Sequence, residues 1–298
     1  MALIGNALTV DVEDYFNVSA FRGIIDRKDW GRYRLRVENN TMRILDLFDR
    51  KSVKGTFFVL VWVAEKCPGL VREILGRGHE VACHGYGHEL VYSIGPEKFR
   101  ADIRKARSLL EDACGRKIWG YRAPSFSITM DSLWALDILI EEGFTYDSSI
   151  FPVYHDVYGM RDATPRPHRI VRSGGVLIEF PLSTLPIRFL RWEIARIPVS
   201  GGGYLRLFPL WFTKMAIRHL NENFRQPVAL YFHPWEIDPG QPRIRAGLKS
   251  RFRHYHNLAH TESRVGALIS SFRFATMRDV LASAFSGAGE SPDGIPLR

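Results

Sequence analysis

Residues 55–88 read GTFFVLVWVAEKCPGLVREILGRGHEVACHGYGH. An apolar run at 55–64 precedes a helical pattern at 68–78, and a second apolar run, HEVAC, ends at a pair of histidines. Segments that alternate in this way between strand-like and helical patterns indicate βα units, which build a parallel sheet or a barrel. This stretch therefore predicts an α/β fold.

The alternation continues on both sides of this stretch. Toward the N-terminus lie a strand-like run at 7–12 and a helical one at 41–50, and toward the C-terminus the pattern continues through 96–115, 118–126, 131–143 and 144–150. Helices ending at Gly76, Gly115 and Gly143 fit this reading. Beyond a loop at 152–167 we expect strands at 175–183 and 227–235, a helix at 208–224, and closing helices at 261–272 and 276–285.

The length of 298 residues suits one barrel domain, and no linker or repeat divides the chain. We expect a single domain over 1–298, with a core at about 5–238 and a C-terminal helical extension at about 239–285. Its three cysteines show no paired spacing, which argues against a disulfide framework. With no secretory signal and no apolar run long enough to span a bilayer, we expect a cytoplasmic protein.

The chain is basic, with 41 Lys and Arg against 32 Asp and Glu, a formal charge of +9. The densest basic stretch, 243–253, lacks the motifs of nucleic-acid modules, so we expect no nucleic-acid partner. A run of this kind is typical of a solvated face. Contact with an anionic substrate, or peripheral association with the inner face of a membrane, is the alternative.

Two histidines with i, i+4 spacing, His84 and His88, follow the run HEVAC. Both imidazoles can face one side of a turn and share a metal ion, which leaves positions for a carboxylate and for water. Taken alone, the pair could equally be two hydrogen-bonding surface histidines.

Three acids, Asp11, Glu13 and Asp14, end the first strand. Strand alternation places Asp11 and Glu13 on the same side, and Asp14 becomes available where the strand breaks. One acid could complete a site of two histidines and one carboxylate, and another could act as a base. Capping of a loop is the alternative reading.

Three further strand ends carry polar groups. Arg122 precedes a proline-stiffened turn and can hold a carboxylate in a bidentate pair, and Asp147 stands in an Asp-Ser-Ser run. His233 ends an apolar strand, where a group that titrates near neutral pH suits proton transfer. Structural roles account for each of them separately.

The order of these motifs resembles that of the NodB-like polysaccharide deacetylases, carbohydrate esterase family four. The element Val-Glu-Asp-Tyr-Phe at 12–16 and the basic, aromatic stretch at 251–255 are similar to the branch tied to exosortase-associated exopolysaccharide loci. The resemblance spans nearly the whole chain. It implies a distorted (β/α) barrel with seven strands and a C-terminal helical extension.

In this family the first motif has two adjacent aspartates, a general base followed by a metal ligand. The match at 9–11 implies Asp11 as the base, but Val12 occupies the position of the ligand. The resemblance therefore moves the metal-binding carboxylate to Glu13 or Asp14 and leaves both open.

The remaining roles follow from the same resemblance. His84 and His88 would bind the metal, Arg122 would pair with Asp11, and His233 would be the general acid, oriented by Asp147. The metal, together with a backbone N–H near Tyr86 or in the proline-containing loop, would stabilise the oxyanion. The residues expected to line the substrate pocket are Tyr86, Phe126, Tyr146, Leu230 and Trp235.

The implied activity is hydrolysis of N-acetyl groups on N-acetylhexosamines of a bacterial exopolysaccharide or of its lipid-linked precursor. The implied cofactor is a divalent metal, foremost Zn²⁺, with Co²⁺, Ni²⁺ or Fe²⁺ as alternatives. Two other functions stay open: a metal-independent hydrolase of cyclic amides or ureides on the same barrel, and a non-catalytic polysaccharide-binding relative.

Overall fold

The computed structural model describes residues 5–155, 158–189, 192–199 and 201–285. Within this part of the chain, seven parallel strands pair in the order β10-β1-β2-β3-β4-β5-β7, and β6 joins β7 in antiparallel fashion. The strands are β1 (Asn6–Val12), β2 (Thr56–Val59), β3 (Glu80–Cys83), β4 (Gly120–Tyr121), β5 (Tyr146–Asp147), β6 (His168–Arg172), β7 (Gly175–Glu179) and β10 (Ala229–Phe232). The α/β fold expected from the sequence is confirmed.

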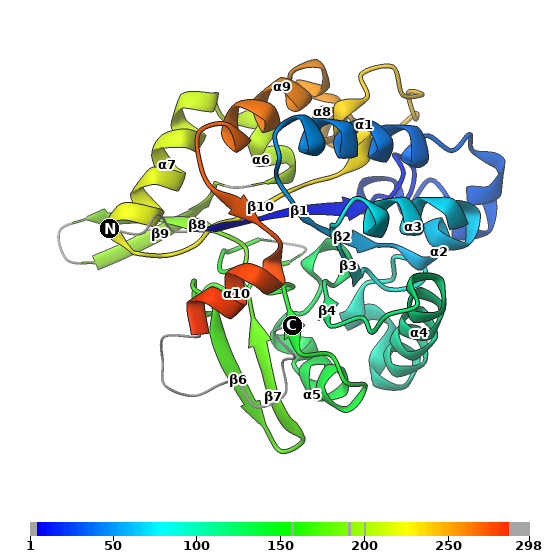
Figure 1. Ribbon diagram of the computed structural model, residues 1–298, viewed down its shortest axis with the longest axis horizontal. Coiled ribbons are helices and arrows are strands. Elements are labelled where there is room, and N and C mark those ends of the chain that lie inside the picture. Colours follow the sequence, from blue (N-terminus) through cyan, green and yellow to red (C-terminus); the bar gives the residue numbers. More distant parts are fainter. Residues whose placement is uncertain (1–4, 156–157, 190–191, 200, 286–298) are drawn as a thin grey trace.

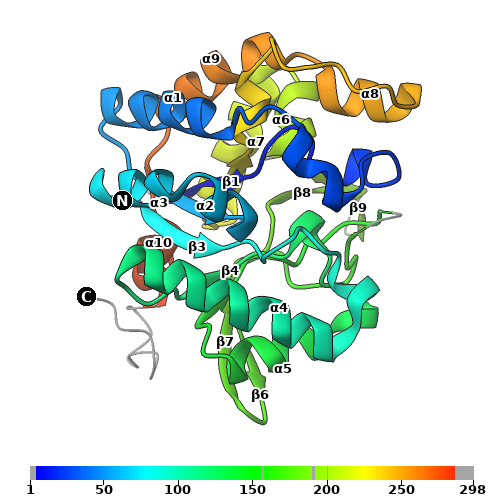
Figure 2. The ribbon, with the colours of Figure 1, turned by 90° about the vertical axis from the view of Figure 1, so that its right-hand side faces the viewer.

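The helices lie outside the curved sheet, as Figures 1 and 2 show. Those that follow the strands are α1 (Val37–Arg50), α2 (Val61–Lys66), α3 (Pro68–Gly76), α4 (Val91–Cys114), α5 (Trp134–Glu141), α6 (Gly202–Leu207) and α7 (Leu210–Asn223). The C-terminal extension adds α8 (Leu248–Tyr255), α9 (Leu258–Ile269), β11 (Phe274–Ala275) and α10 (Met277–Phe285). Both closing helices expected from the sequence are therefore present.

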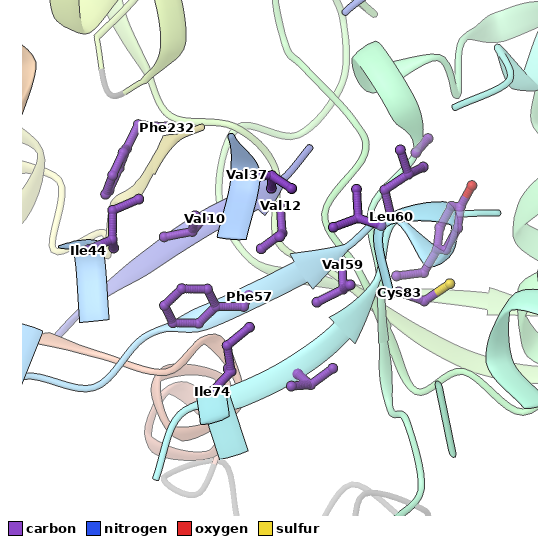
Figure 3. Close-up of a cluster of buried hydrophobic side chains, with 14 of the residues drawn as sticks. Val10, Val12, Val37, Ile44, Phe57, Val59, Leu60, Ile74, Cys83 and Phe232 are labelled. Carbon is purple, nitrogen blue, oxygen red and sulfur yellow. The ribbon is translucent and has the colours of Figure 1, made fainter. Parts of the chain in front are cut away.

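The two faces of each strand have different surroundings. One face packs on the surrounding helices: Val10 and Phe57 of neighbouring strands meet Ile44 of α1 and Ile74 of α3 in the cluster of Figure 3. All seven residues of β1 are buried, which is typical of a parallel strand covered on both sides. Side chains of the other face point into the barrel, and this face supplies the polar groups of the site.

The last helix closes the end of the barrel at which the strands begin. Met277, Val280 and Leu281 of α10 pack with inward-facing residues of the strands. The backbone N–H of Met277 donates to Oγ1 of Thr56, at a distance of 2.7 Å. The helix α10 therefore covers this end, while the opposite end, where the strands finish, is not covered by it.

Some details differ from expectation. The segment after residue 152 contains two antiparallel hairpins, β6–β7 and that of β8 (Thr184–Phe189) with β9 (Trp192–Pro198), where the sequence suggested one strand. Gly115 and Gly143 adopt left-handed backbone conformations at the helix ends as expected, but after α3 this role falls to Gly78 rather than Gly76. Within the described residues, no helix is long and apolar enough to cross a membrane.

Candidate active site

A cavity of about 470 Å³ opens where the strands end. Asp11 lies near the end of β1 and Glu13 directly after it, His84 and His88 come after β3, and His233 comes after β10. All five residues line the cavity. The structure thus gathers residues from distant parts of the chain at one end of the barrel, where active sites of this architecture lie.

Glu13, His84 and His88 form the group best suited to hold a metal ion. One ligand atom from each lies within 4.8 Å of the others, and all three residues are buried. His84 Nδ1 donates to the backbone oxygen of Arg122 at 2.8 Å, which leaves Nε2 for coordination. Glu13 Oε2 lies 2.8 Å from His88 Nε2 without making a hydrogen bond, an arrangement that a shared cation would satisfy. The donor set therefore fits a divalent transition metal.

The protonation states also suit metal binding. Burial lowers the pKa of His84 to about 4, so its imidazole is neutral at pH 7. Burial alone would raise the pKa of Glu13, but His88, His233 and His84 outweigh it and hold this pKa at about 2. The cluster thus offers the neutral imidazole of His84 and the carboxylate of Glu13 at neutral pH.

Asp11 is fixed by an arginine inside the barrel. Arg122 is fully buried, and its Nη1 donates to Asp11 Oδ1 at 2.6 Å. The same guanidinium donates to the hydroxyl of Thr9 and to the hydroxyl and backbone oxygen of Ser148. Asp11 Oδ2 lies 3.9 Å from His233 Nε2. One carboxylate oxygen is thus anchored, and the other lies beside the histidine.

His233 lies between the carboxylates of the site and a buried acid behind it. Its Nε2 is 3.4 Å from Glu13 Oε1, and its Nδ1 is 2.6 Å from Glu236 Oε1. Burial by itself would lower the pKa of His233, but the hydrogen bond to Glu236 and the charges of Glu13 and Asp11 raise it to about 9. His233 is therefore protonated at neutral pH and presents an N–H to the cavity.

A second charged pair supports Glu236 from behind. Glu236 Oε2 accepts from Nε of Arg206, and both side chains are almost wholly buried. The other N–H groups of Arg206 donate to the backbone oxygens of Arg253, His254 and His256 in the C-terminal extension. The site is thus tied directly to that extension.

Aromatic rings form much of the remaining wall. Phe126, Tyr231 and Trp235 line the cavity, and Trp235 stacks on His233 with ring centroids 5.1 Å apart. Trp235 also stacks on His254, with ring centroids 4.1 Å apart. Of the expected pocket residues, Phe126 and Trp235 therefore lie in the cavity.

The other expected pocket residues lie elsewhere. Leu230 faces the helices in the main core, because in β10 the alternation sends Tyr231 and His233 inward instead. The hydroxyl of Tyr146 donates to Glu80, deep in the barrel. Tyr86 donates through its hydroxyl to Glu65 at the surface. The expected placement of these three residues was wrong.

Two expected roles for backbone or carboxylate groups also need correction. The Tyr86 N–H is already donated to Asp102 Oδ2, so it is not available to an oxyanion. Asp14 accepts from the backbone N–H groups of Tyr15, Arg36 and Val37 where α1 begins, which leaves Glu13 as the carboxylate beside the histidines.

Asp147 does not contact His233. It points to the face of β5 opposite Tyr146 and Ser148, where it accepts from Ser149 and lies against Glu179. The acid that contacts His233 is Glu236, which the sequence reading missed. A signal was present, since Glu236 stands three residues after His233 and its carboxylate also accepts from the backbone N–H of His233 at 3.1 Å.

Two family models match parts of this chain. Residues 29–139 match the family model described as polysaccharide deacetylase, and residues 148–282 match a domain of unknown function, DUF3473. A peptidoglycan deacetylase-like protein of Gibberella zeae is 32% identical over 110 residues, which are 36% of this chain and 32% of that protein. The peptidoglycan-N-acetylglucosamine deacetylase of Bacillus cereus is 33% identical over 98 residues, 33% of this chain and 36% of that protein.

The chain thus spans about a third of the length of these curated relatives. The crystal structure of a Mycobacterium smegmatis protein assigned as a polysaccharide deacetylase superimposes with a TM-score of 0.61 at 20% identity, covering 97% of this chain and 92% of that one. This similarity supports the fold. The family match shows that residues 29–139 are similar to polysaccharide deacetylases.

Proposed function

We propose that this chain is a metal-dependent deacetylase that hydrolyses N-acetyl groups on N-acetylhexosamine residues of a bacterial exopolysaccharide or of its lipid-linked precursor. One observation carries the proposal: the buried Glu13–His84–His88 cluster, the anchored carboxylate of Asp11 and the imidazole of His233 share one cavity. These elements suit hydrolysis of an acetamide, in which water must be activated and the departing amine must receive a proton.

The cluster would hold the cation through His84, His88 and Glu13. A divalent metal bound there supplies Lewis acidity, which polarises the acetamide carbonyl and makes a water molecule more acidic. Zn²⁺ is the ion we favour, although Co²⁺, Ni²⁺ and Fe²⁺ also suit two nitrogens and one oxygen.

Asp11 is the proposed general base. Its Oδ1 is held by Arg122, so Oδ2 is the oxygen that can accept a proton from the attacking water. The Arg122 guanidinium is immobilised by Thr9 and Ser148, which fixes the direction of this oxygen. Such orientation reduces the entropy that must be lost to reach the transition state.

His233 is the proposed general acid, and Glu236 positions it. The Nε2–H of His233 faces the cavity and would protonate the amine nitrogen as the C–N bond breaks, giving acetate and a free amino sugar. Glu236 holds the opposite nitrogen at 2.6 Å and thereby sets the orientation of the ring.

We also propose that the two matched regions act as one domain. The cavity is lined by His84, His88 and Phe126 from one region and by Tyr231 and His233 from the other. Neither region alone would contain both a metal cluster and an acid.

The test is acetate release from N-acetylated oligosaccharides by metal-stripped protein, with and without added Zn²⁺. The variants are His84→Ala and Asp11→Asn, with the exposed His260→Ala as the matched control. We expect release that requires metal, disappears in both site variants and persists in the control. Release of product from cyclic amides without metal would favour the other hydrolase class, and metal-loaded binding without any release would favour a binding protein.

A further inference from the structure

The outer wall of the cavity is formed by α8 of the C-terminal extension. Lys249, Phe252 and Arg253 line the cavity, and their spacing of i, i+3 and i+4 places them along one side of the helix, while His256 lines it from the position just after the helix ends. Arg251, on the same helix, does not line it. This side of α8 thus presents basic and aromatic groups to whatever enters.

The inner end of the cavity, its floor, is lined by acidic residues, whereas the outer end beside α8, its mouth, is lined by basic ones. Asp11 and Glu13 are the acidic residues that line the cavity; both are buried on the floor and engaged by Arg122 and the two histidines. Over the described ranges, no carboxylate lies within ion-pair distance of the exposed Arg253 guanidinium, although many other arginines have such a partner. The mouth therefore carries a solvent-exposed cation that has no carboxylate partner among the described residues.

The backbone that carries Arg253 is anchored to the site. Arg206 donates to the backbone oxygens of Arg253, His254 and His256 at 2.8, 3.0 and 2.8 Å. His254 is buried and stacks on Trp235, which in turn stacks on His233. Consequently, Arg253 stands at a set position relative to the proposed acid, as specific recognition requires.

The surroundings indicate what kind of anion would bind. Tyr204 and Phe252 line the same mouth and offer ring surfaces against which sugars can pack. A guanidinium fork matches the oxygens of a carboxylate or a phosphate. A ligand that combines sugar rings with such an anion would use both features at once.

We propose that α8 forms a subsite for an anionic group carried by the saccharide substrate, with Arg253 as its main contact and Lys249 beside it. The inference rests on the proposed deacetylase function and specifies its substrate class. The anion would be either the carboxylate of a neighbouring uronic acid or a phosphate at the reducing end.

Binding to the whole chain can be measured by calorimetry with three tetrasaccharides. The first is a neutral N-acetylglucosamine oligomer, the second alternates N-acetylglucosamine with glucuronic acid, and the third is the neutral oligomer with a reducing-end phosphate. The proteins are wild type, Arg253→Gln and, as the matched control from the same helix, Arg251→Gln. Preference for the second or for the third ligand identifies the source of the anion.

We expect at least one anionic ligand to bind about 10-fold or more tightly than the neutral one at low salt, as charged hydrogen bonds imply. Arg253→Gln should remove most of this preference and Arg251→Gln should keep it. Equal affinities for all three ligands, equal losses in both variants, or no binding at all would overturn the subsite.

Acetate release from the same ligands separates this inference from the proposed function. If the Arg253-dependent preference persists but no ligand is deacetylated, the deacetylase function fails and the subsite stands. If neutral and anionic ligands are deacetylated with the same KM in wild type and in Arg253→Gln, the function stands and the subsite fails.

Discussion

Replacing Glu236 by Gln tests how the proposed acid is held in place. The substitution keeps the size of the side chain but removes a charge that lies 2.6 Å from His233 Nδ1 and contacts Arg206 Nε. The carboxylate of Glu236 accepts hydrogen bonds from both His233 and Arg206. The Gln amide has one oxygen and one NH₂ group, so its NH₂ group faces at least one of these two donors and that hydrogen bond is lost. Arg206 is left as a buried cation without its carboxylate.

Two estimates of the stability cost agree. Removing one partner of a buried ion pair costs about 3–5 kcal/mol. Burial alone would raise the pKa of Glu236, but Arg206 and His233 outweigh it and hold the pKa at about 2, against 4.5 in an unfolded chain. That difference corresponds to roughly 3 kcal/mol. Because the folded pKa is depressed, this stabilisation is present above pH 4.5 and disappears as the pH falls from 4.5 toward 2.

We therefore expect Glu236→Gln to lower the free energy of unfolding by about 3–5 kcal/mol at pH 7. We expect kcat to fall by roughly 10- to 100-fold with little change in KM, since the acid loses its orientation while the cavity keeps its shape. Urea unfolding and acetate release measure the two effects. The double variant with Arg206→Gln should cost less than the two single changes together. A Glu236→Gln protein with wild-type stability and a kcat within about twofold of wild type would refute this role for the pair.

Three further predictions follow from particular contacts. His84→Ala should weaken Zn²⁺ binding by about 100-fold or more in calorimetry, whereas His260→Ala should bind as wild type does. Burial lowers the pKa of His79 from 6.5 to about 4, and its Nδ1 accepts a hydrogen bond from the Gly55 N–H. The free energy of unfolding, measured in urea, should therefore decrease by at most roughly 3 kcal/mol as the pH falls from 6.5 toward 4. His79→Gln should lose this pH dependence. A Cβ on Gly201 would lie 2.0 Å from the Tyr231 ring, so Gly201→Ala should raise KM and lower the free energy of unfolding by about 1–3 kcal/mol. Gly247→Ala, with open space around it, should change neither quantity. An unchanged KM in Gly201→Ala would contradict this prediction.

The sequence was informative wherever a polar group ends a long apolar strand. Asp11 lies near the end of its strand, and Glu13, His84 and His233 directly follow theirs. Because parallel pairing brings strand ends together, the convergence of these residues could be predicted. The overall α/β class followed from the same alternation.

The sequence could not predict on which face of a strand certain side chains lie. β5 has only two residues, too few to show which face Asp147 takes, and it points away from the barrel interior. In β10 every residue is buried, so the apolar pattern did not distinguish Leu230 from Tyr231. Glu236 lies in the turn after the strand, where no periodicity applies.

The central position of β1 has a consequence for how the chain folds during synthesis. Asn6, at the start of this strand, accepts from the N–H of Val228 and donates to the backbone oxygen of Arg273, contacts that bridge 222 and 267 residues. Ribosomes add roughly 5–20 residues per second, so β1 must wait roughly 10–45 seconds for its neighbour β10. During that time one edge of an apolar strand stays unpaired. Chaperone binding to the nascent chain should therefore concentrate on the first strand of the barrel and end only when the last segments emerge.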